Sequence, residues 1–303
     1  MANIPPTKSG KIPFREWETA YEIFGDIEKS PYPPLVVLHG GPGATYRYLL
    51  PIAGITEKYN VPVIFYDQLG CGESTHLLDM DKEFWSVDLF MDELNNLLNK
   101  LGIQDSYSLL GNSWGGMLGS AHAVQQPKGL KKLVLACTLP ATHLWSESCK
   151  RLRALMPDDG GAKLEKHEAD GTTDSPEYEQ LSEWFDSHHG CRIRPLPPCV
   201  TLTYEYLGKN HVVNDAMFGP KDTDPTGNLF GWTIIDELHK INVPTMVCHG
   251  AYDPADDIVV KPFLDNIPTV KKYFKFPESS HMPQVEQTDL YVKQVGEFLA
   301  GEV

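Results

Sequence analysis

Short apolar segments that end in glycine, aspartate or cysteine recur along the chain, and they limit the possible folds more than any other feature. Unbroken apolar runs of this length are typical of strands buried on both faces of a parallel sheet. They span residues 34–40, 61–67, 107–111, 132–137 and 244–250, with a weaker sixth at 271–276. Before them, Phe14–Phe24 alternates apolar and polar residues, which predicts one early antiparallel strand.

Helical patterns separate these segments. Apolar residues recur at spacings of three and four from Leu89 to Leu101, which predicts an amphipathic helix there. Further helices are expected over residues 114–126, 257–266 and 288–300. Alternation of strands and helices predicts an α/β fold, a mostly parallel sheet covered by helices on both faces.

The alternation stops between residues 140 and 235. This interval has no clear buried strand and consists of polar, helix-like stretches. It is too long for a loop within a compact domain. We therefore predict a core formed by residues 1–139 and 236–303, with an inserted helical cap at residues 140–235.

The segment Gly111-Asn112-Ser113-Trp114-Gly115 joins a predicted strand to a predicted helix. Glycines on both sides leave room for a sharp turn that exposes the serine hydroxyl. Such a turn also directs backbone N–H groups toward the reacting centre. The alternative is an ordinary glycine turn with an incidental serine. The strand-to-helix context favours Ser113 as a catalytic nucleophile.

A serine nucleophile needs a base, which in turn is held by an acid. In hydrolases built this way, the order along the chain is serine, acid, histidine. Asp253 follows the strand at residues 244–250, and His281 follows the strand at residues 271–276. Both side chains are therefore expected at the sheet edge that carries the serine. Asp256 and Asp257 are alternative acids.

The segment His39–Gly43 reads HGGPG and directly follows the first buried run. Its glycines and proline predict a tight turn whose N–H groups can bind an oxyanion, although such a turn can also be purely structural. We expect the oxyanion hole to pair the N–H groups of Gly41 and Trp114. Gly40 is expected to bind substrate, and His39 is expected to pack rather than react.

Composition restricts the partners. The chain has 26 basic and 41 acidic residues, and its net charge of -15 would repel nucleic acid. No stretch approaches the roughly 18 apolar residues of a membrane span, and no secretory signal is evident. Six scattered cysteines favour free thiols in the cytoplasm over disulfides. The segment His188–Cys191 lacks a second ligand pair, so we predict no metal site.

Several motifs together resemble the proline iminopeptidase family of α/β-hydrolases, and most of all its fungal members. They are HGGPG, YDQLGCGES, GNSWGGML, INVPTMVCHGAYD and SSHMP, and the likeness extends over nearly the whole chain, including the cap. The resemblance implies an α/β-hydrolase fold, a triad of Ser113, Asp253 and His281, and oxyanion donors at Gly41 and Trp114. It also implies release of an N-terminal residue, often proline, from peptides or amides without a cofactor.

The chain departs from this family where the substrate ammonium would bind. Family members carry Glu in a cap segment of the form Gly-Pro-x-Glu-Phe, and here Asp222 takes that place after a lysine. They also carry Glu after the triad Asp, where this chain has Pro254, and Gln before the serine, where it has Asn112. Fewer carboxylates bind a buried ammonium more weakly. Glu205 or Asp256 could compensate.

The sequence predicts a cytoplasmic serine hydrolase in which Ser113 attacks a carbonyl, His281 is the general base and Asp253 holds the imidazole. The expected substrate is a small amide or short peptide with a small or cyclic acyl residue. One alternative is a hydrolase of esters, lactones or specialised metabolites without a free amine. Another is a non-hydrolytic protein of the same fold, which would usually lack a triad residue.

Overall fold

A computed structural model describes residues 4–221 and 223–301. Within them, an eight-stranded sheet has the order β1-β2-β4-β3-β5-β6-β7-β8. From β4 to β8 neighbouring strands run parallel, whereas β1 and β2 are antiparallel to their neighbours. The strands are β1 (Lys8–Phe14), β2 (Trp17–Phe24), β3 (Leu35–Leu38), β4 (Val63–Tyr66), β5 (Tyr107–Asn112), β6 (Leu130–Ala136), β7 (Thr245–Gly250) and β8 (Val270–Phe276).

The prediction of one early strand over Phe14–Phe24 was wrong in its extent. The chain reverses after Phe14, where Arg15 adopts a left-handed φ of 54°, and Phe14 pairs with Trp17. Only β2 therefore lies within the predicted segment. The strand before it, β1, escaped notice because it is exposed except at Ile12 and Phe14, and so has little apolar signal.

The central strands are buried on both faces, as the apolar runs predicted. Every residue of β3, β4, β5 and β7 is buried. Alternate residues enter two different clusters, because successive side chains of a strand point to opposite faces. Val36 and Leu38 pack in the cluster that contains Phe90, whereas Val37 packs in the cluster that contains Val295.

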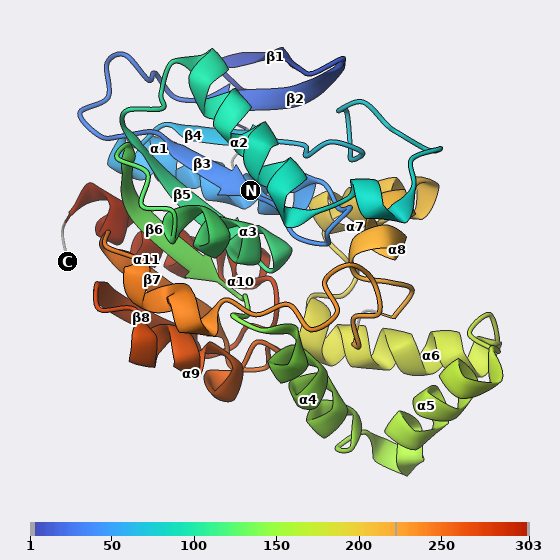
Figure 1. Cartoon of the computed structure of the whole chain (residues 1–303). Coiled ribbons are helices and arrows are strands. Elements are labelled where there is room, and N and C mark those ends of the chain that lie inside the picture. Colours follow the sequence, from blue (N-terminus) through green and yellow to red (C-terminus); the bar gives the residue numbers. More distant parts are fainter. Residues whose placement is uncertain (1–3, 222, 302–303) are drawn as a thin grey trace.

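Helices cover the two faces of the sheet accordingly (Figure 1). One face carries α2 (Val87–Leu101), α3 (Trp114–Ala123) and α9 (Asp257–Asn266), and the other carries the 3-10 helix η1 (Tyr46–Ala53), α1 (Gly54–Tyr59) and α11 (Thr288–Ala300). Helices α9 and α11 have the predicted bounds, whereas α3 ends at Ala123, before the predicted residue 126. Among the described residues, no helix combines the length and apolarity needed to cross a membrane.

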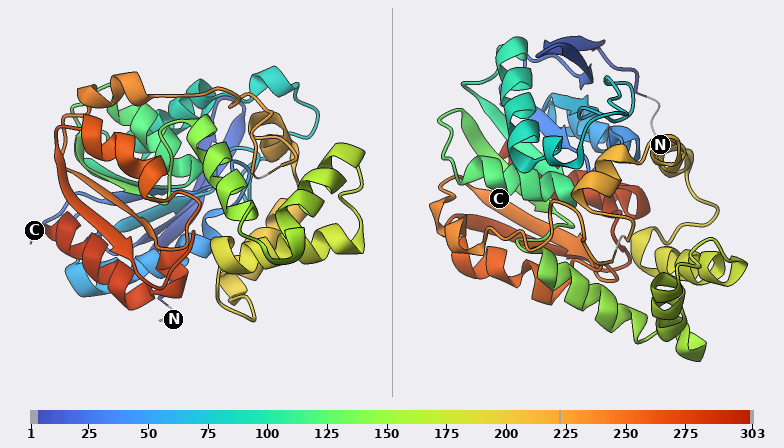
Figure 2. Two further views of the ribbon diagram at one scale, coloured as in Figure 1. Left: turned by 90° about the horizontal axis from the view of Figure 1, so that it is seen from below. Right: turned by 45° about the vertical axis from the view of Figure 1, so that its right-hand side comes forward.

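Between β6 and β7 the described residues form helices, several of which project to one side of the sheet (Figures 1 and 2). The division into core and cap stays a prediction, and we use "cap segment" for residues 140–235. Its main elements are α4 (Thr142–Arg153), α5 (Gly160–Asp170), α6 (Pro176–Phe185), the π-helical turn η4 (Asp186–Gly190), α7 (Pro198–Lys209) and α8 (Val212–Met217).

The two ends of the cap segment meet. Ala141 and Thr233 form an isolated antiparallel bridge. The N–H of Thr142 donates to Trp232 O at 3.0 Å, and the N–H of Ile234 donates to Pro140 O at 2.9 Å. The chain therefore leaves the sheet after β6 and returns toward β7 through one narrow backbone connection, which we call the neck.

Candidate active site

Ser113 lies at the junction of β5 and α3, in a backbone conformation with φ 55° and ψ -124°. A positive φ is uncommon for a residue other than glycine and is found at functional turns. A Cβ at Gly111 would lie 2.1 Å from Gly115 O, and one at Gly115 would lie 2.0 Å from Leu38 O. Only glycine fits at either position, so these residues permit the sharp strand-to-helix turn that the sequence predicted.

Asp253 and His281 lie together after the ends of β7 and β8. The Nδ1 of His281 donates to Asp253 Oδ1 at 2.8 Å, and the N–H of Ala255 donates to the same oxygen at 2.8 Å. Asp253 is 1% exposed. The imidazole is therefore held by a carboxylate that is itself fixed by the main chain.

The two groups also set each other's protonation. Burial raises the pKa of Asp253, but the charge and hydrogen bond of His281 outweigh burial, and the pKa lies below its ordinary value. Burial lowers the pKa of His281, but the Asp253 carboxylate outweighs it and holds that pKa above its ordinary value. The pair therefore favours an ionised Asp253 and an imidazole that readily accepts a second proton.

The alternative acids are engaged elsewhere. Asp256 accepts hydrogen bonds from the N–H groups that begin α9, and it pairs with Arg151. Asp257 accepts hydrogen bonds from Tyr273 and Lys275. In this structure the carboxylate bonded to the candidate base is that of Asp253.

A cavity of about 710 Å³ lies over these groups. Ser113, His281, Gly41 and Trp114 line its wall on the side of the sheet. The structure thus brings the predicted nucleophile, base and oxyanion donors to one cavity. The cap segment supplies much of the remaining lining, including Trp145, Leu164, Tyr178, Phe185, Leu207 and Phe218.

The HGGPG segment forms the expected turn. Gly41 has a φ of 106°, and a Cβ there would lie 2.7 Å from the nitrogen of Ala44. His39 is fully buried, its Nδ1 donates to Gly40 O, and its Nε2 accepts the N–H of Gln68 at 3.0 Å. Burial lowers the pKa of His39 to about 4. His39 is therefore a neutral group that orders the turn.

Gln68 connects the turn to the nucleophile segment. Its amide nitrogen donates to His39 O at 3.1 Å, and its Oε1 accepts the indole N–H of Trp114 at 2.8 Å. The motif Tyr66–Ser74 thus has a structural role beside the site, because this glutamine links the HGGPG turn to the residue that follows Ser113.

The residues predicted to bind substrate do not all lie at the cavity. Asp222 lies outside the described residues. Glu205 is exposed on α7 and is not part of the cavity lining, whereas Pro254 does line the cavity. The backbone N–H of Gly40 donates to the hydroxyl of Tyr48 at 2.9 Å. The roles of these residues in substrate binding remain predictions.

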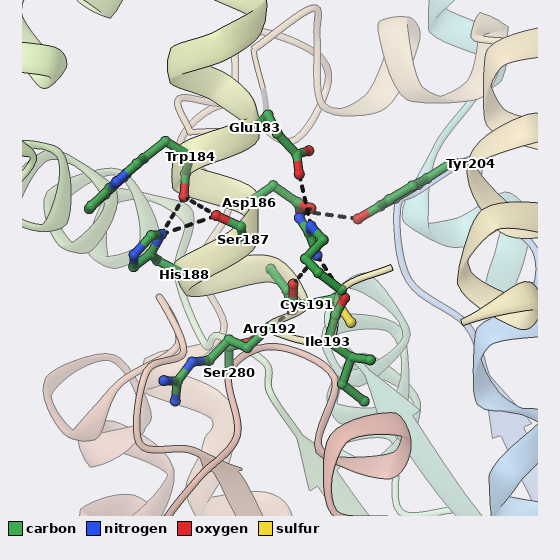
Figure 3. Close-up of polar contacts among 12 residues, drawn as sticks. Glu183, Trp184, Asp186, Ser187, His188, Cys191, Arg192, Ile193, Tyr204 and Ser280 are labelled. Carbon is green, nitrogen blue, oxygen red and sulfur yellow. Dashed lines mark hydrogen bonds and ion pairs between the residues drawn. The ribbon is translucent and has the colours of Figure 1, made fainter. Parts of the chain in front are cut away.

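Sequence analysis missed two acids that line the cavity at the end of α6, Glu183 and Asp186. Both bind Arg194: its Nε lies 2.8 Å from Glu183 Oε1, and its Nη2 lies 3.1 Å from Asp186 Oδ2. Tyr204 donates to Asp186 at 3.1 Å (Figure 3). The available signal was the segment EWFDSHHGCRIR, in which two acids lie three residues apart and arginine follows.

The π-helical turn joins the cap segment to the loops of the acid and the base. His189 Nδ1 donates to the carbonyl of Tyr252, the residue before Asp253, at 2.8 Å. The backbone N–H of His281 donates to His189 O at 3.2 Å. The hydroxyl of Ser280 donates to Gly190 O at 2.9 Å. The cap segment is thus hydrogen-bonded directly to the loops that carry Asp253 and His281.

One cysteine lies near the acid and base. Among the described residues, Cys137, Asp253 and His281 are the group whose potential ligand atoms lie within 4.8 Å of one another. Burial raises the pKa of Cys137 well above its ordinary value, so the group is a thiol. A metal would need the thiolate, which burial disfavours. The six cysteines are free.

Comparison with known proteins agrees with this geometry. Residues 33–288 match the alpha/beta hydrolase fold family. A proline iminopeptidase of Lactobacillus helveticus is 35% identical over 291 residues, 96% of this chain and 97% of the relative. A proline iminopeptidase structure from Mycobacterium smegmatis has 38% identity and a TM-score of 0.91 over 96% of this chain and 97% of that one.

A further solved structure, that of VinJ, is 43% identical, with a TM-score of 0.95 over 99% of this chain and 100% of that chain. The source organisms of these two iminopeptidases are bacterial, so they give no support to a specifically fungal likeness. The chain belongs to the α/β-hydrolase family, with proteins named proline iminopeptidase among its full-length relatives.

Proposed function

We propose that the protein is a serine hydrolase that cleaves the amide bond after an N-terminal, proline-like residue. The carrying observation is that one cavity is lined by Ser113 and by His281, whose imidazole binds a buried carboxylate at 2.8 Å. Full-length relatives named proline iminopeptidase support the choice of substrate. A small substrate, handled in the cytoplasm, fits this function.

In the acylation step, Ser113 Oγ attacks the substrate carbonyl carbon, and His281 Nε2 takes the hydroxyl proton. Asp253 stabilises the imidazolium that forms. The carbonyl oxygen becomes an oxyanion, which the N–H groups of Gly41 and Trp114 would bind. The C–N bond then breaks, the amine takes the proton from His281, and the acyl group remains on Ser113.

Water completes the cycle. His281 removes a proton from a water molecule, whose oxygen attacks the acyl carbon. The second tetrahedral intermediate collapses, the ester bond to Ser113 breaks, and Oγ recovers a proton from His281. The products are the released amine and the free amino acid.

A second candidate is a hydrolase for amides, esters or lactones that lack a free amine. Two observations favour it. Pro254, which cannot bind a cation, lines the cavity beside the acid, and the carboxylates of Glu183 and Asp186 are already paired with Arg194. At either of these two carboxylates, a substrate ammonium would have to compete with that guanidinium.

The decisive experiment compares prolyl arylamide, N-acetylprolyl arylamide and a p-nitrophenyl ester, with Ser113→Ala as the control. Cleavage of the free prolyl arylamide alone supports the aminopeptidase. Equal or faster cleavage of the acetylated compound or the ester supports the second candidate. Retention of activity by purified Ser113→Ala would overturn both.

A further inference from the structure

We propose that Tyr48 is a positioning residue that locks the oxyanion turn to the nucleophile segment. Its hydroxyl accepts the N–H of Gly40 at 2.9 Å and donates to the side-chain oxygen of Asn112 at 2.6 Å. Gly40 precedes Gly41, and Asn112 precedes Ser113. The inference rests on the proposed function, because it concerns how the oxyanion donors of that reaction are aimed.

The two hydrogen bonds of the Tyr48 hydroxyl, to Gly40 and to Asn112, form what we call the bridge. It lies beyond the point where β3 and β5 stop pairing. The parallel pairing of β3 with β5 ends at Leu38 and Gly111. Beyond this pair the chain enters the HGGPG turn on one side and the serine turn on the other. The Tyr48 hydroxyl spans them as both acceptor and donor, so it takes over the role that a ladder hydrogen bond has within the sheet.

The contact is tight and belongs to the site. A Cβ at Gly40 would lie 2.8 Å from the Tyr48 oxygen and 3.0 Å from Ser113 Cβ. Tyr48 is 4% exposed and lines the cavity. Burial raises its pKa above the ordinary value, so the phenol keeps the proton that it donates to Asn112.

Two anchors then fix the direction of the Gly41 N–H. This N–H shares a planar peptide unit with the carbonyl of Gly40. That carbonyl accepts the Nδ1–H of His39 at 2.9 Å, while the nitrogen of Gly40 is held by Tyr48. With both ends of Gly40 anchored, the Gly41 N–H has little freedom to turn. The Gly40 N–H already donates to Tyr48, so it is not free to act as an oxyanion donor itself.

Asn112 depends on the same bridge. Its Nδ2 is buried and has no hydrogen-bond partner among the described residues, so its orientation relies on the bond from Tyr48. Because Asn112 and Ser113 are consecutive, a change in that amide acts directly on the nucleophile turn. Tyr48 therefore orients both sides of the reacting carbonyl.

The test is Tyr48→Phe, which removes the hydroxyl and keeps the ring. We expect kcat to fall about 10- to 100-fold, with KM changed less than about threefold, because a small misplacement of an oxyanion donor acts on the transition state. The substrate is prolyl arylamide, or the p-nitrophenyl ester if only that is cleaved. The rate of Ser113 labelling by a fluorophosphonate should fall by a similar factor, since its tetrahedral adduct uses the same donors.

Tyr291→Phe is the matched control. The Tyr291 hydroxyl is also buried, and burial raises its pKa well above the ordinary value, but it has no hydrogen-bond partner among the described residues. Its removal should leave kcat and the labelling rate unchanged. If both variants lose activity equally, loss of a buried phenol oxygen, rather than the bridge, explains the effect, and the proposal is overturned.

A double-mutant cycle with Asn112→Ala sharpens the test. If Tyr48 acts through this bridge, the double variant should be no more than about twofold slower than the slower single variant, because either change breaks the same connection. Multiplicative losses, or a folded Tyr48→Phe enzyme with kcat within threefold of wild type, would refute the bridge. Failure of the proposed function looks different: Ser113→Ala then keeps its activity.

Discussion

The sheet edge and the cap segment form opposite walls of one cavity, yet they are built in different ways. At the sheet edge, the acid is buried and its carboxylate accepts a main-chain N–H, and glycines at the serine turn contact backbone atoms. On the cap side, the cavity-lining acid Glu183 is held by an ion pair with Arg194, and its side chain is 61% exposed. The catalytic acid is thus held by buried main-chain contacts, whereas this acid of the cap segment is held by an ion pair that solvent reaches.

The largest expected contrast comes from acid-to-amide changes in the two walls. Asp253→Asn should lower kcat/KM by roughly 10⁴-fold, because the imidazolium loses its counter-charge. Glu183→Gln should change it less than about threefold, because an exposed ion pair contributes little. Steady-state kinetics on both purified variants provide the measurement. Similar losses in the two would remove the distinction between the walls.

The same pair of variants gives a pH dependence. Protonated His281 cannot accept a proton from Ser113, so activity should rise with pH through the pKa of His281. Asp253 holds that pKa above its ordinary value of 6.5, which places the wild-type midpoint above 6.5. The residual activity of Asp253→Asn should have a lower midpoint, and Glu183→Gln an unchanged one. Profiles of kcat/KM from pH 5 to 9 would show it.

The next largest effect should come from adding a methyl group to the tightly packed serine turn. In Gly115→Ala the new Cβ would lie 2.0 Å from Leu38 O, so backbone must move. We expect a loss of roughly 3 kcal/mol or more in the free energy of unfolding, as for other severe clashes in a packed core. Urea unfolding of the variant beside wild type measures it. A loss below 1 kcal/mol in the free energy of unfolding would mean that the backbone of the turn can move aside at little cost, which would contradict the close packing described.

Buried carboxylates are a further property of the core. Glu93 is fully buried and accepts hydrogen bonds from the Thr19 hydroxyl and the Leu69 N–H, and burial raises its pKa from 4.5 to about 7. The folded protein therefore keeps a proton that the unfolded chain releases, so stability should fall as pH rises from 4.5 to 7. The fall from this group is up to about 3 kcal/mol.

Glu93→Gln should remove that share of the fall. Glu177→Gln, a change at an exposed acid of the cap segment, should leave the profile above pH 5 as in wild type, because hydrogen bonds with His167 and Lys163 hold the pKa of Glu177 below its ordinary value of 4.5. Unfolding at pH 5, 6, 7 and 8 tests the pair. Asp67, whose pKa burial raises to about 6, contributes in the same direction in every variant. An unchanged slope in Glu93→Gln would contradict the assignment.

The smallest expected effect is a gain in stability rather than a loss. Gly208 lies within α7 with no atom within 4 Å of the position of a Cβ. Gly208→Ala should therefore stabilise the protein by about 0.5–1 kcal/mol, because alanine loses less conformational freedom in a helix. A rise in Tm confirms it. Destabilisation would show that the cap helix is packed more tightly than its surroundings indicate.

The sequence predicted the parts of the molecule that local pattern controls. Apolar runs located the buried strands, and apolar spacing located α2, because both depend on which residues face the core. Helices α9 and α11 were expected beside the last strand, from the alternation of strands and helices. The early hairpin was missed because the exposed β1 has little apolar signal. The positions of Ser113, Asp253 and His281 follow from strand ends, which parallel topology gathers at one edge.

Contacts between distant segments were beyond that reasoning. The link from Tyr48 to Gly40 and Asn112 depends on how η1 packs against the ends of two strands, and no motif encodes it. Pairing of Glu183 and Asp186 with Arg194 likewise requires the chain to fold back through the π-helical turn. The local sequence shows which polar residues are present, but it does not show which distant residues they contact.

The neck has a consequence for how this enzyme can be re-engineered. Because Ala141 and Thr233 are bridged, the cap segment enters and leaves the fold at two adjoining points of the backbone. A relative's segment joined at those points would keep the register of β6 and β7 and replace the substrate wall. The replacement would also have to supply the hydrogen bonds that His189 and Gly190 make to the loops of Asp253 and His281.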